Sequence, residues 1–326
     1  MATRAVLMDR DLRLHLGERE LTPRVPGEVL VAVEWAGLCG SDLHVMGSGD
    51  WVAYWPATLG HEVAGRVLES DDPALPAGTA VVLDSRMPCG DCDGCGRSSQ
   101  LCEHMAWLGE KIPGGYADAL TVPAAMVHQV PARLDLADAV LAEPLAVVMS
   151  ALDRVGGTPR SVLVLGYGPI GALTHLEVAN RWPSAEVSVV EPSPGRAGLA
   201  AARGALVVGG DDERFDLVVD AAGYPASLTD AIDRASTGGT VLLVALSSRP
   251  APVLSAAVVE RSLTITGSVG FAADHLARAL ARLADDPEGF REVVSHRVPL
   301  AEFPTFLAGG TFRTAGKVLV RCGSAS

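Results

Sequence analysis

One short segment constrains the fold of this chain more than any other. The segment contains three glycines, Gly166, Gly168 and Gly171, and directly follows residues 161–165, which are mostly apolar. Residues 170–180, which have helical spacing, begin just before the third glycine. The glycine pattern alone is a weak signal, but a strand, a glycine turn and a helix in this order are typical of dinucleotide binding. The first glycine permits a tight turn, the second lets the backbone approach a pyrophosphate, and the third lets helix and strand pack closely.

The residues around this turn predict which dinucleotide binds. The helix start at Pro169 and Ile170 would present free N–H groups and the positive end of the helix dipole to phosphate. The next expected strand, 187–190, ends at Glu191. A carboxylate there accepts hydrogen bonds from the adenosine ribose and repels a 2′-phosphate, which favours NAD over NADP. Arg196 weakens this preference, because an arginine nearby could bind a phosphate or stack on adenine.

The organisation of the chain indicates two domains of different construction. Strands and helices, among them an expected helix over 227–235, alternate in the middle of the chain, which is typical of a parallel sheet built from βαβ units. The chain before this region is rich in short apolar runs interrupted by Gly and Pro, which predicts a β-rich unit. We therefore predict an α/β protein with a doubly wound parallel-sheet domain over 145–270 and a β-rich domain formed by 1–144 and 271–326. Strands of the β-rich domain are expected at 29–34, 64–68, 80–83 and 119–122.

Composition excludes several classes of protein. The 326 residues carry a net charge of −13 and contain no run of Lys or Arg, which argues against binding to nucleic acid. The most apolar stretch, 236–259, is broken by glycines and prolines, so we expect a buried strand and a loop and no membrane-spanning helix. No signal-peptide pattern stands at the N-terminus, and we expect a cytoplasmic protein without a membrane partner.

A first group of chemically active side chains is spread over the β-rich region. Cys39, Ser41, Asp42 and His44 fall within six positions, His61 and Glu62 follow, and Glu143 comes much later. A thiolate, an imidazole and a carboxylate can together hold zinc and leave its fourth position open. Zinc with an open position lowers the pKa of a bound water or alcohol, which is useful for catalysis.

A second group is more specific. Cys89, Cys92, Cys95 and Cys102 lie within fourteen positions, and four thiolates close a tetrahedral zinc site without an open position. We therefore predict a structural zinc in a lobe over about residues 85–105, with His104 as an alternative ligand to Cys102. A set of free or redox-active cysteines is the competing interpretation.

Taken in order along nearly the whole chain, these motifs resemble the zinc-dependent medium-chain dehydrogenase/reductase superfamily, which is the alcohol dehydrogenase superfamily. They are most similar to its polyol (sorbitol) and threonine dehydrogenase branch. The resemblance implies a catalytic zinc held by Cys39, His61 and Glu143, with Cys322 as the alternative third ligand. It also implies a structural zinc on the four cysteines, so that two zinc ions bind per chain.

The resemblance further implies roles for the neighbouring residues. Ser41 and His44 match the proton relay, Asp42 matches a carboxylate that orients the ligand histidine, and Glu62 matches an acidic residue beside the metal that exchanges with water or ligand. Residues expected to line the nicotinamide side of the cofactor are Val244, Leu246, Ser268 and Val269.

The fold implied by the resemblance is a GroES-like catalytic domain joined to a Rossmann domain, assembled as a homo-oligomer, either a dimer or a tetramer. The implied reaction interconverts an alcohol and its ketone or aldehyde by hydride transfer to or from NAD. The substrate class would be a polyol, sugar, cyclitol or amino alcohol. The aromatic residues within 51–55 and the pair Ser85 and Arg86 fall in regions that border the substrate pocket in relatives.

Two other functions remain as alternatives. One is a zinc-independent reductase of activated double bonds on the same scaffold. The other is a non-catalytic, cofactor-binding relative that kept the fold. Both would be expected to lack the cysteine, histidine and glutamate set, whereas Cys39, His61 and Glu143 are all present.

Overall fold

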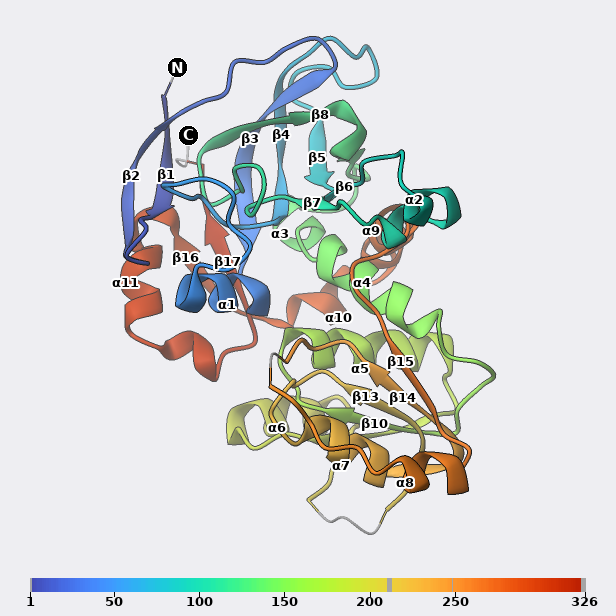
Figure 1. Ribbon diagram of the computed structural model, residues 1–326. Helices are drawn as coiled ribbons and strands as arrows, with labels where there is room; N and C mark the ends of the chain where they lie inside the picture. Colours follow the sequence, from blue (N-terminus) through green and yellow to red (C-terminus); the bar gives the residue numbers. More distant parts are fainter. Residues whose placement is uncertain (1, 210–212, 248, 324–326) are drawn as a thin grey trace. The chain divides into compact units, whose positions relative to one another are not determined.

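The structure is a computed structural model that describes residues 2–209, 213–247 and 249–323 (Figure 1). The chain divides into two compact units. The first, the β-rich unit, comprises Met1–Glu143, Ala272–Arg313 and Lys317–Ser326, and the second, the parallel-sheet unit, comprises Pro144–Phe271 and Thr314–Gly316. Helix α4 (Ala142–Leu152) contains the first boundary between them. Among the described residues, no helix is both long and apolar enough to cross a bilayer.

A seven-stranded sheet forms the centre of the β-rich unit. Its order is β16-β17-β3-β4-β5-β9, and β8 pairs with β3 outside this path. All four strands expected in this unit are confirmed, since each lies within one of these elements. The strands are β3 (Glu28–Gly37), β4 (Glu62–Ser70), β5 (Ala80–Leu83), β8 (Ala119–Pro123), β9 (Val127–Gln129), β16 (Val294–Pro299) and β17 (Lys317–Arg321).

The C-terminal strand β17 brings the end of the chain to the candidate site. β17 pairs antiparallel with β3, with Leu319 opposite Gly37. Residues from the end of the chain are thereby brought beside the loop that begins at Leu38, whose backbone N–H donates to the carbonyl of Val318. Strand β17 is buried except at its last residue, and it supplies both core and polar side chains.

Smaller elements complete the β-rich unit. The hairpin of β1 (Ala2–Met8) and β2 (Leu14–Glu20) forms a separate two-stranded sheet, as do β6 (Arg86–Met87) and β7 (Ala106–Trp107) on either side of the cysteine lobe. Its helices are α1 (Gly40–Ser48), α2 (Asp93–Arg97), α3 (Leu136–Ala139), α9 (His275–Asp285), α10 (Pro287–Arg291) and α11 (Phe303–Ala308). Single 3₁₀ turns are η1 (Ser99–Leu101), η2 (Ala124–Met126), η3 (Leu300–Glu302) and η4 (Thr311–Arg313).

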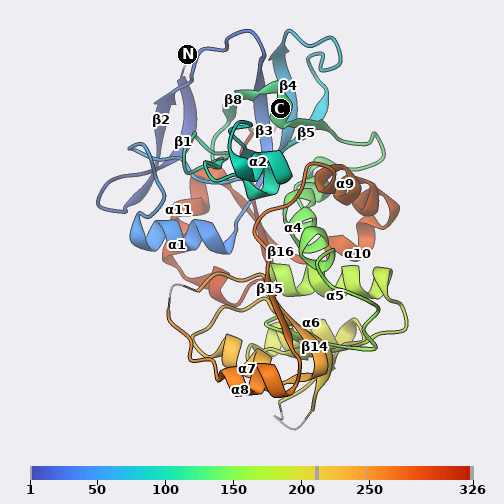
Figure 2. The same ribbon diagram turned by 45° about the vertical axis from the view of Figure 1, so that its right-hand side comes forward.

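The second unit is built on one six-stranded parallel sheet in the order β12-β11-β10-β13-β14-β15. Figure 2 shows α5 on one side of this sheet and α7 with α8 on the other, so the predicted doubly wound arrangement is confirmed. The strands are β10 (Ser161–Leu165), β11 (Glu186–Val190), β12 (Leu206–Val207), β13 (Phe215–Asp220), β14 (Ala235–Leu243) and β15 (Thr264–Gly267). The helices are α5 (Pro169–Arg181), α6 (Pro194–Ala202), α7 (Ser227–Asp233) and α8 (Ser255–Glu260).

Two local predictions in this unit are corrected by the structure, one at the end of a helix and one in a loop. The helix expected over 227–235 ends at Asp233, because Ala235 already pairs with Phe215 as the first residue of β14. The loop expected at the end of 236–259 contains α8, which has no buried residue among those described. Its Ala257 packs against the core while only partly buried, and six residues are too few to show a helical period, which is why the pattern did not reveal it.

Candidate active site

The loop between β3 and α1 carries the first candidate ligand. Cys39 is the N-cap residue of α1, with an extended backbone at φ −101° and ψ 158°. Its backbone N–H donates to the carboxylate of Asp42, three residues into the helix, at 3.0 Å. An acidic side chain that reaches back to the cap in this way fixes the start of a helix. The sequence therefore determines locally where the Cys39 thiol lies.

Asp42 is the centre of a buried hydrogen-bond network. Its side chain is 4% exposed, and it accepts hydrogen bonds from the Tyr116 hydroxyl at 2.7 Å and the Gly60 N–H at 3.3 Å. Its Oδ1 atom lies 3.5 Å from Nδ1 of His61. Burial raises the pKa of Asp42, but His61 and the hydrogen-bond donors outweigh it and leave the pKa lowered. A carboxylate in this position holds the His61 ring by Nδ1 and leaves Nε2 available to bind a metal ion.

Gly60 has to be glycine for this arrangement to form. Its φ is +93°, and a Cβ at this position would lie 2.9 Å from the Tyr116 ring. The turn at Gly60 leads the chain into His61 and then into β4, which begins at Glu62. Tyr116, which no sequence motif indicated, thus both contacts this turn and donates a hydrogen bond to Asp42.

Three of the predicted residues come together closely enough to hold a metal ion. One ligand atom each of Cys39, His61 and Glu62 lies within 4.8 Å of the others. Burial opposes a charge on His61, but the Asp42 carboxylate and Cys39 outweigh it and raise its pKa well above the ordinary value. A thiol, an imidazole and a carboxylate are donors that suit zinc, so the residues present fit the expected metal.

Glu143 lies outside this close group of three but shares its electrostatic environment. Its carboxylate is buried and accepts a hydrogen bond from the Ser85 hydroxyl at 2.7 Å. Burial raises its pKa to about 7, while His61 opposes the increase. Cys322, the alternative third ligand, is also buried, but its thiol donates to the carbonyl of Gly115 at 3.3 Å and belongs to neither group of candidate ligands.

A lysine that sequence reasoning missed completes the surroundings of the ligand group. Lys317 is 1% exposed and donates from Nζ to the carbonyl of Leu38 at 3.0 Å and to the carboxylate of Glu62. Burial opposes the charge of Lys317, but Glu62 and Cys39 outweigh it and raise its pKa. The available signal was a lysine at the start of an apolar strand, since lysine is almost never buried unless it is paired.

The two relay candidates lie on the same helix. Ser41 and His44 are three residues apart on α1, a spacing that places side chains on one face. The Nε2 atom of His44 lies 3.2 Å from Oδ2 of Asp50, and its ring centroid lies 4.6 Å from that of Trp51. Of the aromatic residues in 51–55, Trp51 therefore contacts the candidate relay residue His44.

Arg86 does not have the free charge that would recognise an anionic substrate. It is 3% exposed, and its Nε and Nη2 atoms donate to the two carboxylate oxygens of Asp84 at 3.0 and 2.8 Å. Asp84 also accepts a hydrogen bond from the Arg86 backbone at 2.9 Å. The neighbouring Ser85 instead turns toward Glu143.

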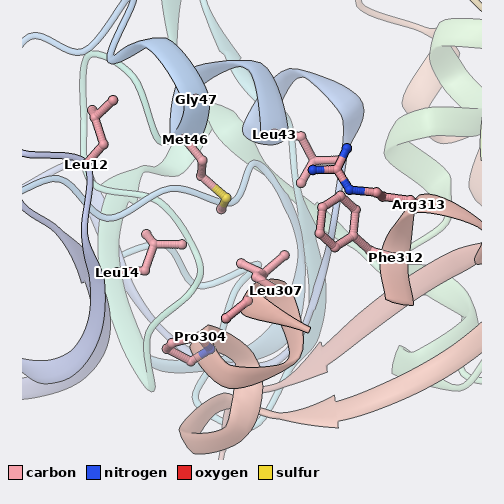
Figure 3. Close-up of a pocket in the computed structure, with 10 residues that line it drawn as sticks. Leu12, Leu14, Leu43, Met46, Gly47, Pro304, Leu307, Phe312 and Arg313 are labelled. Carbon is pink, nitrogen blue, oxygen red and sulfur yellow. The ribbon is translucent and has the colours of Figure 1, made fainter. Parts of the chain in front are cut away.

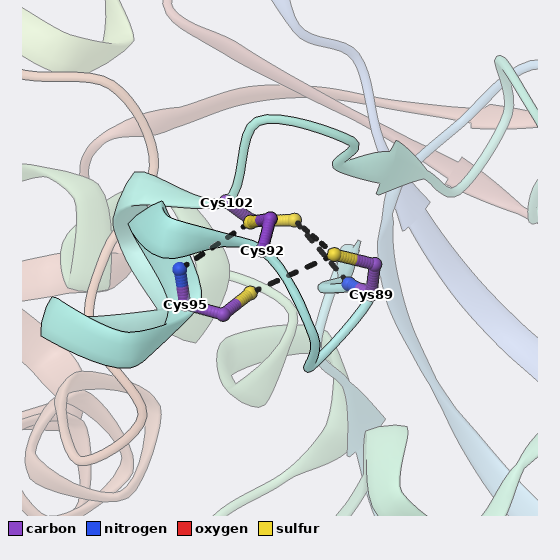
Figure 4. A group of neighbouring side chains, drawn as sticks. All are labelled: Cys89, Cys92, Cys95 and Cys102. Atoms are coloured by element: carbon purple, nitrogen blue, oxygen red, sulfur yellow. Dashed lines mark hydrogen bonds between the residues drawn. The ribbon is translucent and has the colours of Figure 1, made fainter.

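The four clustered cysteines form a separate group in the lobe between β6 and β7. Their sulfur atoms all lie within 4.8 Å of one another, and Figure 4 shows the four side chains directed toward a common centre. Hydrogen bonds from the backbone of Glu103 and Cys95 lower the pKa of Cys92 to about 6. Four thiols, one of them readily ionised, fit a closed zinc site. His104 is not a member of this group within the described residues.

The glycine turn of the parallel-sheet unit is built as the sequence predicts. It connects β10 to α5, whose N-cap is Gly168 and whose first residue is Pro169. A Cβ on Gly171 would lie 2.0 Å from the carbonyl oxygen of Gly166, so the third glycine is required for turn and helix to meet. A Cβ on Gly168 would meet only Arg196, at 3.8 Å, which leaves a backbone cradle beside the N-terminus of α5. The backbone N–H of Ile170 belongs to the first turn of this helix and fits a phosphate.

Glu191 lies immediately after β11 and faces this turn. Its two oxygens accept hydrogen bonds from the N–H groups of Tyr167, at 2.7 Å, and Ser193, at 2.8 Å. The side chain of Glu191 is 3% exposed, and Arg196 Nη1 lies 3.9 Å from its Oε2. Arg196 also donates to the carbonyl of Ala315 at 2.9 Å.

The expected nicotinamide-side residues lie at the same edge of the sheet, because they follow the carboxyl ends of β14 and β15. The backbone N–H of Val244 donates to the carbonyl of Asp220, and the backbone N–H of Ser268 donates to the carbonyl of Leu243. The hydroxyl of Ser268 is buried without a hydrogen-bond partner, which is consistent with a polar ligand at this edge. Leu246 and Val269 are 70% and 56% exposed.

A groove in the β-rich unit uses another part of α1. Figure 3 shows Leu43 and Met46 of α1 facing Leu307 of α11, and the groove has a volume of about 460 Å³. Its ten lining residues are mostly apolar and include none of the candidate metal ligands.

Comparisons with known proteins agree with this architecture. A family model described as the alcohol dehydrogenase GroES-like domain matches residues 25–132, and one described as the glucose dehydrogenase C-terminus matches residues 137–311. The predicted combination of a GroES-like domain with a Rossmann-type parallel sheet is confirmed.

Individual relatives cover most of the chain. D-altritol 5-dehydrogenase of Agrobacterium fabrum is 32% identical over 90% of this chain and 92% of its own. L-threonine 3-dehydrogenase of Bacillus velezensis is 29% identical over 85% of this chain and 86% of its own. A dehydrogenase from Sinorhizobium meliloti 1021, solved bound to NADP, superposes with a TM-score of 0.90 at 25% identity and covers 98% of this chain and 99% of its own.

Proposed function

The chain belongs to the zinc-dependent medium-chain dehydrogenases of the alcohol dehydrogenase superfamily, and on this premise we propose that it interconverts a polyhydroxy or amino alcohol and its ketone with NAD. It is an oxidoreductase acting on CH–OH groups with a nicotinamide cofactor. The observation that carries the proposal is the close approach of Cys39, His61 and Glu62, with His61 held by the buried Asp42.

We propose that Cys39, His61 and Glu143 hold the catalytic zinc and that Glu62 lies beside it. When bound, zinc polarises the oxygen of the alcohol, and the nicotinamide ring accepts the hydride. Asp42 orients His61, and the hydrogen bond from Ser85 orients Glu143.

Proton transfer is assigned to Ser41 and His44 of α1, which are both half-buried. Ser41 accepts the proton of the alcohol as it releases its own, and His44 receives that proton as a base. The side chain of His44 is 38% exposed, so it can pass a proton to water. Imidazole suits this role because it can both accept and release a proton.

The residues of this chain favour NAD, although the solved relative named above holds NADP. Glu191 is anchored by two backbone N–H groups at the edge of the glycine turn. A carboxylate fixed there repels a 2′-phosphate, which supports NAD. Arg196 lies 3.9 Å from Glu191 and balances part of that charge.

The substrate class follows the relatives and the ligand set. The two relatives named above are dehydrogenases of D-altritol, a polyol, and of L-threonine, an amino alcohol. We propose a substrate of this kind, with several polar groups. We further propose a structural zinc on the four cysteines, a catalytic domain over 1–144 and 271–326, and a NAD-binding domain over 145–270.

A homo-oligomer is proposed from the edge of the parallel sheet. β15 is the last strand in the described order, so one of its edges is open within the described residues. Leu254 and Val259, beside and on the neighbouring α8, are 72% and 75% exposed. An open strand edge next to exposed apolar side chains favours pairing with a second copy. Light scattering of the purified protein tests this proposal by giving the molar mass in solution.

The experiment that tests the function follows NADH at 340 nm over a panel of sugar alcohols, cyclitols, amino alcohols and simple alcohols. Turnover of one compound class, abolished in Glu143→Ala and retained in the matched exposed variant Glu302→Ala, supports the reaction and the ligand. Absence of turnover with NAD and NADP, in protein that holds two zinc ions per chain, contradicts the proposed substrate class. Absence of turnover in protein that holds no catalytic zinc contradicts the ligand set.

A further inference from the structure

We propose that Asp50 is a positioning residue for His44: its carboxylate fixes the proton of the imidazole on Nε2, and Trp51 holds the plane of the ring. The inference rests on the proposed function, since it assigns a partner to the proposed relay. It concerns two residues, Asp50 and Trp51, that lie outside the proposed metal and cofactor sites.

The turn after α1 is constructed so that Asp50 faces back toward His44. Gly49 ends the helix in a left-handed conformation at φ +74°, and its N–H donates to the carbonyl of Val45 at 2.7 Å. The Asp50 N–H donates to the Ser48 hydroxyl at 3.1 Å, and that hydroxyl donates to the carbonyl of His44 at 3.0 Å. These bonds tie the backbone of Asp50 to the last turn of α1. They bring Oδ2 of Asp50 within 3.2 Å of Nε2 of His44.

Trp51 supplies the second, independent observation. Its φ is +68°, a conformation that residues other than glycine rarely adopt. Strained backbone of this kind tends to occur where a side chain must be held in a particular place. Here the strained residue directs its indole onto His44, with ring centroids 4.6 Å apart and planes inclined by 33°. The imidazole is therefore in contact both with the Asp50 carboxylate and with an aromatic face.

The chemistry of the imidazole gives this contact a consequence. A neutral imidazole carries one N–H, and an ionised carboxylate can only accept a hydrogen bond. The pair with Asp50 therefore places the proton on Nε2 and leaves the lone pair of Nδ1 free to act as the base. During alcohol oxidation, Nδ1 is the atom that finally accepts the proton that leaves the alcohol by way of Ser41, and the resulting imidazolium passes one proton to water and returns to its starting state. The Asp50 carboxylate stabilises the imidazolium while it lasts.

The pair between Asp9 and His15 provides a matched control in the same unit. Nδ1 of His15 lies 3.4 Å from Oδ2 of Asp9, and the two side chains are 48% and 41% exposed. In the pair between His44 and Asp50 the side chains are 38% and 58% exposed. Exposed pairs like these add little to stability, so an effect confined to Asp50 reports on its contact with His44.

The direct test reads the tautomer and does not require activity. Histidine is labelled with ¹⁵N, and the His44 signals are identified by their loss in His44→Gln. We expect the Nε2–H tautomer in the wild type and a measurable increase of the Nδ1–H tautomer in Asp50→Asn, whose amide can donate to Nε2, while Asp9→Asn leaves the His44 signals unchanged. Nδ1–H in the wild type, or identical His44 signals in wild type and Asp50→Asn, would overturn the proposal.

Kinetics with the substrate found in the panel gives the second test. Proton-transfer groups contribute on the order of 100- to 10,000-fold to rate, and we expect Asp50→Ala to lose roughly tenfold in kcat with little change in KM. Asp50→Glu should recover most of this loss, and Asp50→Ala should have no further effect in a His44→Ala background. A full additional loss in that background contradicts the proposal. If the wild type turns over nothing, the proposed function fails, while the tautomer measurement still decides the role of Asp50.

Discussion

The ammonium of Lys317 and the carboxylate of Glu62 form an ion pair inside the β-rich unit, although 255 residues separate them in the chain. Both side chains are 1% exposed. The pair lies beside Cys39, whose charge also raises the pKa of Lys317. A charge at this depth requires its partner, because an unpaired ion in the interior is strongly destabilising.

Lys317→Met is therefore expected to lower the free energy of unfolding by about 3–5 kcal/mol, which is the usual cost of breaking a buried pair. Urea denaturation measures this change. The chain has one other lysine, Lys111, which is exposed. Lys111→Met serves as the control and should shift the midpoint little. A double variant, Lys317→Met with Glu62→Leu, should recover much of the loss, and no recovery would show that the ion pair is not the cause.

Asp42→Asn is expected to weaken zinc binding at the catalytic site by about 10- to 100-fold, the range typical for residues that orient a metal ligand. The reason is that a neutral amide lacks the negative charge that makes the His61 imidazole a stronger ligand, and it holds Nδ1–H of His61 less firmly than the carboxylate that now lies 3.5 Å away. Competition with a chelator of known affinity, monitored by metal analysis, measures the change. The buried Asp138, which pairs with Arg291, offers a control of similar burial remote from these ligands. An equal effect of Asp138→Asn would contradict a specific role for Asp42.

The cysteine lobe should show selective thiol chemistry in protein from which the proposed structural zinc has been removed. Backbone hydrogen bonds lower the pKa of Cys92 to about 6, whereas a side-chain hydrogen bond with Asp91 raises that of Cys89 to about 12. Thiolates are the reactive form, so iodoacetamide at pH 7 should modify Cys92 well before Cys89. The rate at Cys92 should rise as pH increases through about 6 and then level off, which peptide mass spectrometry follows. Zinc should protect both residues, and equal rates in the zinc-free protein would argue against these environments.

Glu191→Ala is expected to raise KM for NAD by roughly tenfold and to improve the use of NADP, because it removes the carboxylate proposed to bind the ribose and to repel a 2′-phosphate. Initial rates with each coenzyme at a fixed alcohol concentration measure the ratio. Glu186→Ala, at the exposed start of the same strand, is the matched control. An unchanged ratio of the two coenzymes in Glu191→Ala would contradict the assigned preference.

The local motifs could be predicted from sequence because their members are close together in the chain. The glycine turn of 166–171, its flanking strand and helix, and the four cysteines each depend on spacings of a few residues. Backbone periodicity and turn chemistry determine such units before tertiary packing acts. The capping contact between Asp42 and the Cys39 backbone belongs to the same class.

Only the tertiary structure decided which distant groups meet. Tyr116 reaches Asp42 across 74 residues, and Ser85 reaches Glu143 across 58. Lys317 meets Glu62 because β17 and β4 both pair with β3, a register that no local pattern encodes. The sequence by itself thus determined which residue types are available as candidate metal ligands, and it determined the glycine turn between β10 and α5. The sheet pairing decided the buried charges and hydrogen bonds around them, because such contacts depend on chain segments that approach one another only in the folded state.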